Sequence, residues 1–184
     1  MDHIQNLMLE QLARTAPEGS LSILEVGCGK NALLPYVATL SPHATLTGID
    51  VSQKAIDTAR RISRTPVKWQ VASVEHTPFE DDQFDIVLAC RTLHHWKDKA
   101  QGLAEISRIL KPQGFLLLGD PFTEGLLAHS WLNWIAEKLD GGTVTSLGDL
   151  QCMLALTRLQ LTDKIVVPSS AGMLLVCMIT KLSS

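Results

Sequence analysis

The sequence lacks the features that mark several broad classes of protein. No apolar run reaches the roughly 18 residues of a membrane-spanning helix, and residues 1–16 have a helical period instead of the basic and apolar segments of an export signal. Aromatic residues make up only 5% of the chain, and 16 basic against 19 acidic side chains give a net charge of −3. Without a positive surface field, nucleic acid and anionic membranes are poor partners, and we expect neither.

Cysteine is also scarce. The four thiols of Cys28, Cys90, Cys152 and Cys177 are widely spaced, without the close pairs of zinc sites or the density of a secreted disulfide scaffold. We therefore expect reduced cysteines in a cytoplasmic protein. A chain of 184 residues, 46% of them hydrophobic, has enough apolar side chains for the core of one ordinary domain, so 1–184 is expected to be a single domain.

The sequence does contain a regular alternation of short β-rich runs and helical segments, which is typical of a parallel sheet covered by helices. Apolar runs predict five strands, over residues 22–26, 45–49, 67–71, 85–89 and 115–119. Two further strand-like runs, 163–168 and 173–181, are joined by too few residues for a crossover helix and must form an antiparallel hairpin. The predicted fold is α/β, Rossmann-like and doubly wound, with a mainly parallel seven-stranded sheet ending in that hairpin.

The stretch LEVGCGKNA at 24–32 lies where the first strand turns into a helix. An open α/β sheet binds its ligand at this edge, and Gly27 and Gly29 let the backbone approach that ligand closely. Asp50, at the end of the second strand, can accept hydrogen bonds from two ribose hydroxyls. With Ala32 the pattern also satisfies a relaxed dinucleotide fingerprint, so an NAD-dependent oxidoreductase is one interpretation of these residues.

The residues around the turn help to distinguish a dinucleotide from a ligand that carries an ammonium group. Glu25 stands two residues before the first glycine, where a carboxylate suits an ammonium group better than a pyrophosphate. Together with the terminal hairpin, these features resemble the class I S-adenosylmethionine-dependent methyltransferases, specifically the small-molecule subgroup similar to the ubiquinone and menaquinone methylases. The resemblance runs from about Leu21 to the C-terminus. It rests on four segments in the family's order: ILEVGCGKN, LTGIDVS, VEHTPFEDDQFDIVLACRTLHHW and LAEISRILKPQGFLLLGD.

The resemblance implies S-adenosylmethionine as cofactor and S-adenosylhomocysteine as product. It implies that Glu25 reaches the methionine amino group, that backbone at Gly27 and Gly29 lines methionine and ribose, and that Asp50 accepts the ribose hydroxyls. The cofactor-binding residues expected on this basis are Glu25, Gly27, Cys28, Gly29, Asp50, Val51, Ser73, Val74 and Cys90.

Two positions depart from the family's pattern. Asn31 stands where the family often has another glycine, and asparagine tolerates the left-handed conformation. Ser73 stands where the family usually has an aspartate that meets the adenine amino group, although the backbone of Val74 can still present its N–H to the ring. If Ser73 occupies the family's adenine-contact position, as the resemblance implies, Ser73→Asp is expected to tighten cofactor binding. Cys90 is expected to serve through its small size and its backbone carbonyl.

Methyl transfer requires alignment and, for hydroxyl or acidic carbon nucleophiles, removal of a proton. His94 and His95 follow the fourth strand, and either imidazole can act as the base or simply bond to backbone at a helix start. Arg91 and Asp120 lie on the same rim and are candidates for substrate binding. Paired histidines without a nearby carboxylate at ligand spacing make a poor metal site, so no metal is expected.

Two helices are expected to close the pocket, an N-terminal one over 1–16 and an inserted, lid-like one over about 124–140, which comes before a final helical segment over 148–159. Trp131 and Trp134 lie on the apolar face of the second and are further candidates for substrate contact. The sequence thus predicts methyl transfer to a small, apolar acceptor. The alternatives are a cofactor-binding protein without transferase activity and the NAD-dependent oxidoreductase.

Overall fold

The fold was obtained as a computed structural model that describes residues 1–123, 142–169 and 172–183. The strands along the chain are β1 Ser22–Val26, β2 Thr45–Asp50, β3 Val67–Val71, β4 Phe84–Cys90, β5 Leu110–Thr123, β6 Thr145–Ser146, β7 Leu159–Ser169 and β8 Gly172–Lys181. The helices are α1 His3–Thr15, α2 Leu34–Leu40, α3 Gln53–Ile62, the short 3-10 helix η1 Leu93–His95, α4 Lys99–Ile109 and α6 Leu147–Leu154.

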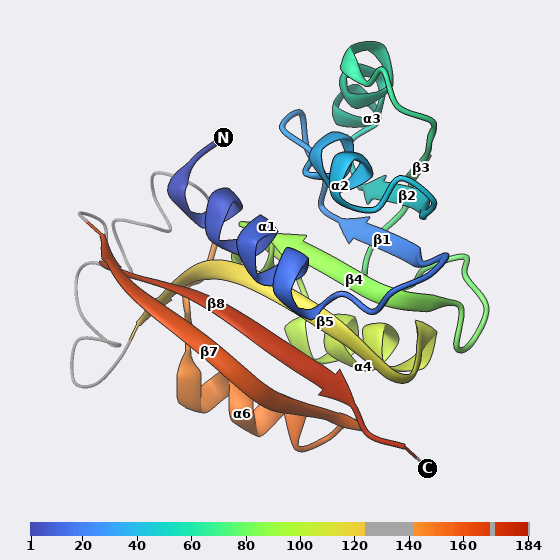
Figure 1. The fold of residues 1–184 in the computed structure, drawn as a ribbon. Helices are drawn as coiled ribbons and strands as arrows, with labels where there is room; N and C mark the ends of the chain where they lie inside the picture. Colours follow the sequence, from blue (N-terminus) through green and yellow to red (C-terminus); the bar gives the residue numbers. More distant parts are fainter. Residues whose placement is uncertain (124–141, 170–171, 184) are drawn as a thin grey trace.

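One sheet runs through the whole described structure in the order β3-β2-β1-β4-β5-β8-β7 (Figure 1). The first five strands are parallel, and β8 pairs antiparallel with both β5 and β7. This arrangement confirms the predicted doubly wound sheet and its C-terminal hairpin. The two-residue strand β6, which pairs with the end of β5, was not predicted.

The prediction placed the start of the hairpin too late in the sequence. A helix was expected as far as residue 159, but α6 ends at Leu154 and β7 already begins at Leu159. Leu159 is buried and pairs with Lys181 of β8. Pairing with β8 therefore places Leu159 in a strand, although the helical period of the sequence assigned it to the preceding helix.

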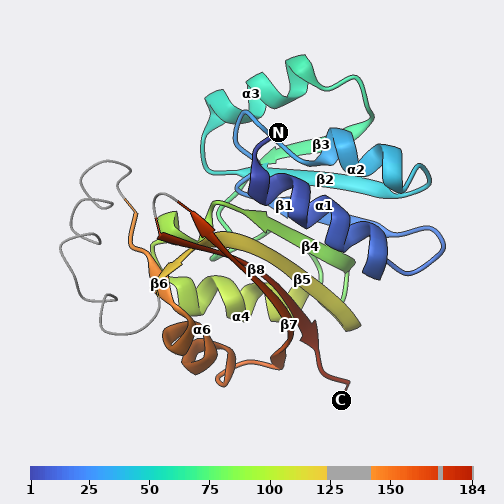
Figure 2. The same ribbon diagram turned by 60° about the vertical axis from the view of Figure 1, so that its left-hand side comes forward.

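Helices cover both faces of the sheet, as Figure 2 shows. On one face, buried side chains of α4 and α6 pack against alternate residues of β1, β4 and β5. On the other, α1 and α2 pack against the intervening residues of the same strands. The alternation follows from the pleat, which turns successive side chains of a strand to opposite faces, so the central strands are apolar throughout.

The N-terminal helix was predicted over 1–16, and α1 occupies His3–Thr15. Asp2 caps it by accepting the backbone N–H of Gln5, whose side chain in turn accepts the N–H of Asp2. Met8 packs over β5, where a side chain at Gly119 would collide with its sulfur. This packing brings the start of α1 to the edge of the sheet where the parallel strands end.

The predicted lid-like helix, with Trp131 and Trp134, lies outside the described residues. Within the described ranges, no helix is long and apolar enough to cross a membrane.

Candidate functional site

The turn after β1 has the conformation that its glycines predict. Gly27 and Gly29 have φ angles of +63° and +55°, in the left-handed region that other residues rarely adopt. A Cβ on Gly27 would lie 2.0 Å from the Thr92 hydroxyl oxygen, so Gly27 has no room for a side chain. The turn is tied to the sheet by the Cys28 N–H, which donates to the Ile49 carbonyl at 3.0 Å.

Asp50 ends β2 directly beside this turn. Its Oδ2 accepts the N–H of Gly29 at 2.8 Å, and its Oδ1 accepts the N–H of Ser52, also at 2.8 Å. A carboxylate offers about four lone pairs, so each oxygen keeps one for a further donor. The two backbone amides thus fix the orientation of Asp50 and leave a lone pair on each oxygen for a further donor.

A cavity of about 560 Å³ opens beside Asp50 at the carboxyl ends of β1 to β4. Its lining is Gly27, Gly29, Asp50, Val51, Ala72, Ser73, Val74, Glu75, Arg91, Thr92, His95, Trp96 and Lys97. The predicted residues Val51, Ser73 and Val74 are therefore brought together with Asp50, as an adenosine site requires. Sequence reasoning missed Glu75, whose carboxylate contacts the Ser73 hydroxyl.

Glu25 is buried at the start of the same turn, with 2% of its surface exposed. Its carboxyl oxygens accept the backbone N–H groups of Leu33 and Leu34 at 2.9 to 3.2 Å, at the start of α2. Burial raises the pKa of Glu25 to about 8, although these amide hydrogen bonds act in the opposite direction. A cationic group placed beside Glu25 would favour its ionised form.

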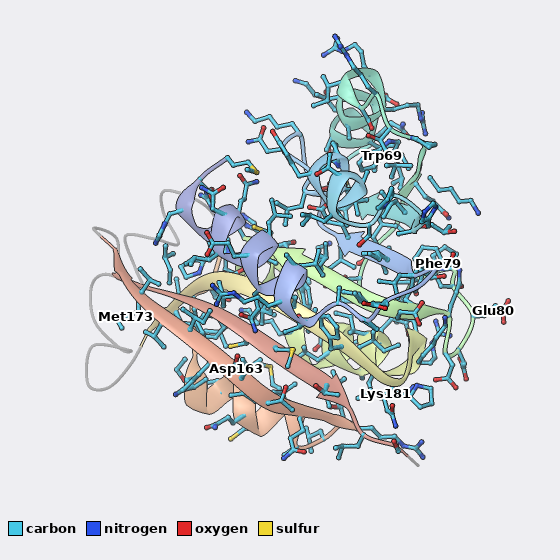
Figure 3. All side chains as sticks on the ribbon, in the orientation of Figure 1. Trp69, Phe79, Glu80, Asp163, Met173 and Lys181 are labelled. Atoms are coloured by element: carbon cyan, nitrogen blue, oxygen red, sulfur yellow. The ribbon has the colours of Figure 1, made fainter. Side chains whose placement is uncertain are left out.

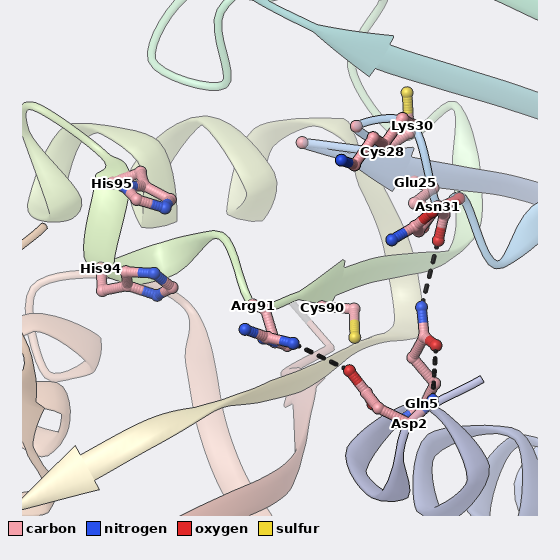
Figure 4. Close-up of a pocket in the computed structure, with 12 residues that line it drawn as sticks. Asp2, Gln5, Glu25, Cys28, Lys30, Asn31, Cys90, Arg91, His94 and His95 are labelled. Carbon is pink, nitrogen blue, oxygen red and sulfur yellow. Dashed lines mark hydrogen bonds and ion pairs between the residues drawn. The ribbon is translucent and has the colours of Figure 1, made fainter. Parts of the chain in front are cut away.

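A second cavity of about 280 Å³ continues from the first and includes Glu25 (Figure 4). Arg91 crosses it, with Nη1 2.9 Å from the Asp2 carboxylate at the start of α1. Gln5 donates from Nε2 to the Asn31 carbonyl at 3.1 Å. These contacts join the N-terminal helix to the loops after β1 and β4, so α1 forms one wall of the cavity.

The two histidines line this second cavity with their rings 4.0 Å apart. His94 is 7% exposed, and its Nδ1 lies 2.7 Å from Oδ1 of Asp120, which is 1% exposed. The other oxygen of Asp120 accepts the N–H of Leu93 at 2.9 Å. Asp120, predicted to contact substrate, thus contacts His94 and the backbone of η1.

The thiols of Cys28 and Cys90 also belong to this region. Burial raises the pKa of both thiols, and nearby carboxylates act in the same direction. Neither is a thiolate at neutral pH, which fits the expectation that Cys90 serves through its size.

The pairing of His94 with Asp120 was not anticipated, because 26 residues separate them. A signal was nevertheless present in the sequence. Each residue closely follows an apolar strand, and strands β4 and β5 are adjacent and parallel. Side chains at the carboxyl ends of adjacent parallel strands meet at the same edge.

Comparison with known proteins identifies the family. A family model described as a methyltransferase domain matches residues 24–118, which is just over half of the chain. The chain belongs to this methyltransferase family. The match confirms the predicted class I S-adenosylmethionine-dependent family and its cofactor, and it includes the glycine turn, Asp50, Ser73 and both histidines.

Two relatives show how far the sequence similarity extends. The chain is 33% identical over 165 residues to an uncharacterized 37.1 kDa protein in transposon TN4556 of Streptomyces fradiae, covering 88% of this chain and 42% of that one. It is 34% identical over 111 residues to phthiotriol/phenolphthiotriol dimycocerosates methyltransferase 1 of Mycobacterium ulcerans, covering 58% of this chain and 41% of that one. The chain therefore spans less than half the length of these curated relatives.

The fold of this chain is also found among solved structures. Geranyl diphosphate C-methyltransferase from Streptomyces coelicolor, solved with S-adenosyl-L-homocysteine, superposes with a TM-score of 0.86 at 13% identity. The alignment covers 97% of this chain and 75% of the other. At that identity the likeness establishes the fold alone.

Proposed function

We propose that this protein transfers the methyl group of S-adenosylmethionine to a hydroxyl oxygen of a small, largely apolar acceptor, with His94 as the general base. The observation that carries the proposal is the buried contact between His94 and Asp120 at the wall of the second cavity. A carboxylate can only accept, so Nδ1 of His94 carries the hydrogen in this contact. The basic lone pair of the neutral ring is then on Nε2.

The residues of the two cavities fit the cofactor. Asp50 would hold the ribose hydroxyls, the turn of Gly27 and Gly29 would lie against the ribose and methionine, and Glu25 would face the methionine ammonium group. When bound, the cofactor supplies a methyl group already activated by its sulfonium. The chain's own tasks are then to align the acceptor, to exclude water and to remove one proton.

His94 performs the last of these tasks. As the acceptor oxygen forms its bond to the methyl carbon, the bond from that carbon to sulfur breaks, and Nε2 of His94 takes the hydroxyl proton. The carboxylate of Asp120 stabilises the imidazolium that results and holds the ring in place through Nδ1. Arg91 and His95 lie at the junction of the two cavities, where they can contact the acceptor.

The charge of the chain and the names of its relatives support this class of acceptor. A net charge of −3 does not favour nucleic acid, which fits a small molecule. The Mycobacterium ulcerans relative is named for phthiotriol and phenolphthiotriol dimycocerosates, and the Streptomyces coelicolor enzyme for geranyl diphosphate. We propose that Trp131 and Trp134 contribute to binding an apolar acceptor in this single domain. We also propose a cytoplasmic location, in keeping with the four free cysteines.

The proposal is tested by substitution of the histidine. Transfer of a labelled methyl group from S-adenosylmethionine to a panel of phenols and hydroxylated lipids identifies an accepted compound. With that compound, His94→Gln is expected to lower the rate of transfer by about 10²- to 10⁴-fold, the usual contribution of a general base. Affinity for S-adenosylhomocysteine, measured by calorimetry, should change by less than about threefold, since His94 is outside the adenosine cavity.

Two further variants sharpen this test. Asp120→Asn places an amide beside Nδ1 that can donate to it, which favours the tautomer with hydrogen on Nε2 and should lower transfer in the same way. His43→Gln is the matched control, because His43 is an exposed histidine outside both cavities. Wild-type transfer rates in folded His94→Gln protein would exclude His94 as the base.

A further inference from the structure

We infer that Arg91 selects an acceptor that carries a carboxylate in addition to its hydroxyl group, and that Asp2 takes the place of that carboxylate until the acceptor binds. The inference rests on the proposed function, because it concerns the acceptor of the same methyl transfer. Arg91 lines both cavities, and Figure 4 shows its guanidinium group directed across the second one toward Asp2. The cavity proposed to receive the acceptor thus has a cationic group in its wall.

The backbone of Arg91 has an unusual conformation for an arginine. Its φ angle is +53°, in the left-handed region that residues with a Cβ adopt at a cost in energy. The neighbouring strand holds this conformation, because the Arg91 N–H donates to the Gly119 carbonyl at 2.7 Å. Strained residues of this kind are concentrated at binding and active sites. Glycine or asparagine would suit the backbone better, so the backbone does not explain why an arginine stands here.

The contact between Arg91 and Asp2 is weaker than the contact an arginine can make with a carboxylate. It joins Nη1 to Oδ2 at 2.9 Å, whereas Oδ1 of Asp2 accepts the N–H of Gln5 as the cap of α1. The ion pair is therefore a single contact instead of the bidentate pair that these groups favour. The two side chains are 56% and 41% exposed, and ion pairs so exposed contribute little. Another carboxylate can therefore displace Asp2 at low cost.

A carboxylate on the acceptor is not tied to a helix cap, so both of its oxygens can turn toward the guanidinium group. The charges around the cavity favour such an anion. Lys30 is exposed at the rim and adds a second positive charge, while the carboxyl oxygens of Glu25 are engaged by backbone amides. His94 lines the same cavity as Arg91. A hydroxy acid that is otherwise apolar can thus present its hydroxyl to His94 and its carboxylate to Arg91.

The inference is tested by calorimetry at neutral pH on protein saturated with S-adenosylhomocysteine. The probes are the ortho, meta and para hydroxybenzoates, each compared with the hydroxybenzamide of the same substitution pattern. Acid and amide have nearly the same shape and differ by one charge. At least one acid is expected to bind about tenfold more tightly than its amide, the difference made by hydrogen bonds to a charged group.

Arg91→Asn tests the role of the arginine. The variant loses the positive charge, and asparagine accepts the left-handed backbone, so the turn is retained. The preference for the acid should fall below about twofold, whereas affinity for S-adenosylhomocysteine should stay within about threefold of wild type. Arg14→Gln is the matched control, because it removes an exposed arginine in the last turn of α1. It should keep the wild-type preference.

Asp2→Asn tests the displacement of Asp2. Asparagine caps a helix as well as aspartate does, so α1 keeps its start while the competing charge is lost. The acid should then bind about threefold more tightly than to wild type, whereas affinity for the amide should not change. Glu80→Gln is the matched control. It also removes one negative charge, from an exposed side chain outside both cavities that points away from the fold in Figure 3.

The variants also distinguish a purely structural role. A preference for the acid that persists in Arg91→Asn would overturn the role of Arg91. An equal change for acid and amide in Asp2→Asn, or no change, would show that Asp2 serves only to hold α1 and would overturn its displacement. A loss of more than about tenfold in affinity of Arg91→Asn for S-adenosylhomocysteine would assign Arg91 to the carboxylate of the cofactor, against the inference.

Failure of the inference can be told from failure of the proposed function. If none of the acids binds more tightly than its amide, the inference is overturned, while methyl transfer by His94 to a neutral hydroxyl compound still stands. If wild-type protein does not bind S-adenosylhomocysteine, the proposed function is overturned and the inference with it.

Discussion

The two cavities meet at Gly27, Gly29, Arg91 and His95, yet they are built by different means. The adenosine cavity is fixed mainly by backbone groups, such as the amides that hold Asp50 and Glu75. The wall of the second cavity is fixed by side-chain pairs between distant segments. Arg91 with Asp2 and His94 with Asp120 are separated by 89 and 26 residues.

This difference shows how one fold can keep a cofactor and vary its acceptor. Backbone amides at strand ends are supplied by the fold, whatever side chains surround them. Side-chain pairs can be exchanged by single substitutions without altering the sheet. Substitutions of residues held by backbone amides, such as Asp50, should therefore affect cofactor affinity, whereas substitutions in the side-chain pair of His94 and Asp120 should affect transfer.

The largest effect on the cofactor side is expected at Gly27. Gly27→Ala adds a Cβ that collides with Thr92 and forces a left-handed alanine, which together should cost about 3 kcal/mol of unfolding free energy. Gly29→Ala is the matched control. Its φ is similarly positive but its Cβ would approach only the Gly27 carbonyl, at 3.9 Å, so only about 1 to 2 kcal/mol should be lost. Chemical denaturation measures both, and equal losses would contradict the close packing against Thr92.

A smaller effect is expected at Asp50. Asp50→Ala removes the acceptor for two ribose hydroxyls and should weaken binding of S-adenosylhomocysteine tenfold or more, measured by calorimetry. NAD should give no heat with either protein. Asp57→Ala, on the exposed face of α3, should leave affinity unchanged. Unaltered affinity in Asp50→Ala would remove the ribose assignment.

A pH-dependent effect is expected from the titration of Glu25. Its pKa is raised from 4.5 to about 8 in the folded protein, so the folded state binds the proton more tightly than the unfolded state. The stabilisation is complete below about pH 4.5 and is lost as the pH rises toward 8. Glu25→Gln should remove this part of the pH dependence of the unfolding free energy. Identical slopes for wild type and Glu25→Gln between these pH values would contradict it.

Much of the fold was predictable because its signals are local. Strands such as 85–89 are apolar throughout, since both faces of the sheet are covered, and the link before β8 is too short for a helix. The boundary at Leu159 was less predictable, because pairing with β8 overrides the helical period there. Strand β6 was also not predictable, because two residues are too few to form a recognisable sequence pattern.

The sequence by itself determined the glycine turn and the place of Asp50, at the edge of the sheet where the cofactor is proposed to bind. Glycine permits left-handed backbone in any surroundings, and Asp50 follows its strand at a fixed distance along the chain from Gly27 and Gly29. These residues can therefore be recognised without knowledge of any other segment. Only the tertiary structure decided that Asp120 contacts His94, that Arg91 reaches Asp2, and that Glu75 contacts the hydroxyl of Ser73. These contacts depend on which strands are neighbours and on how side chains are oriented at their ends. Hydrogen bonds act over about 3 Å, and no pattern along the chain specifies distances through space on that scale.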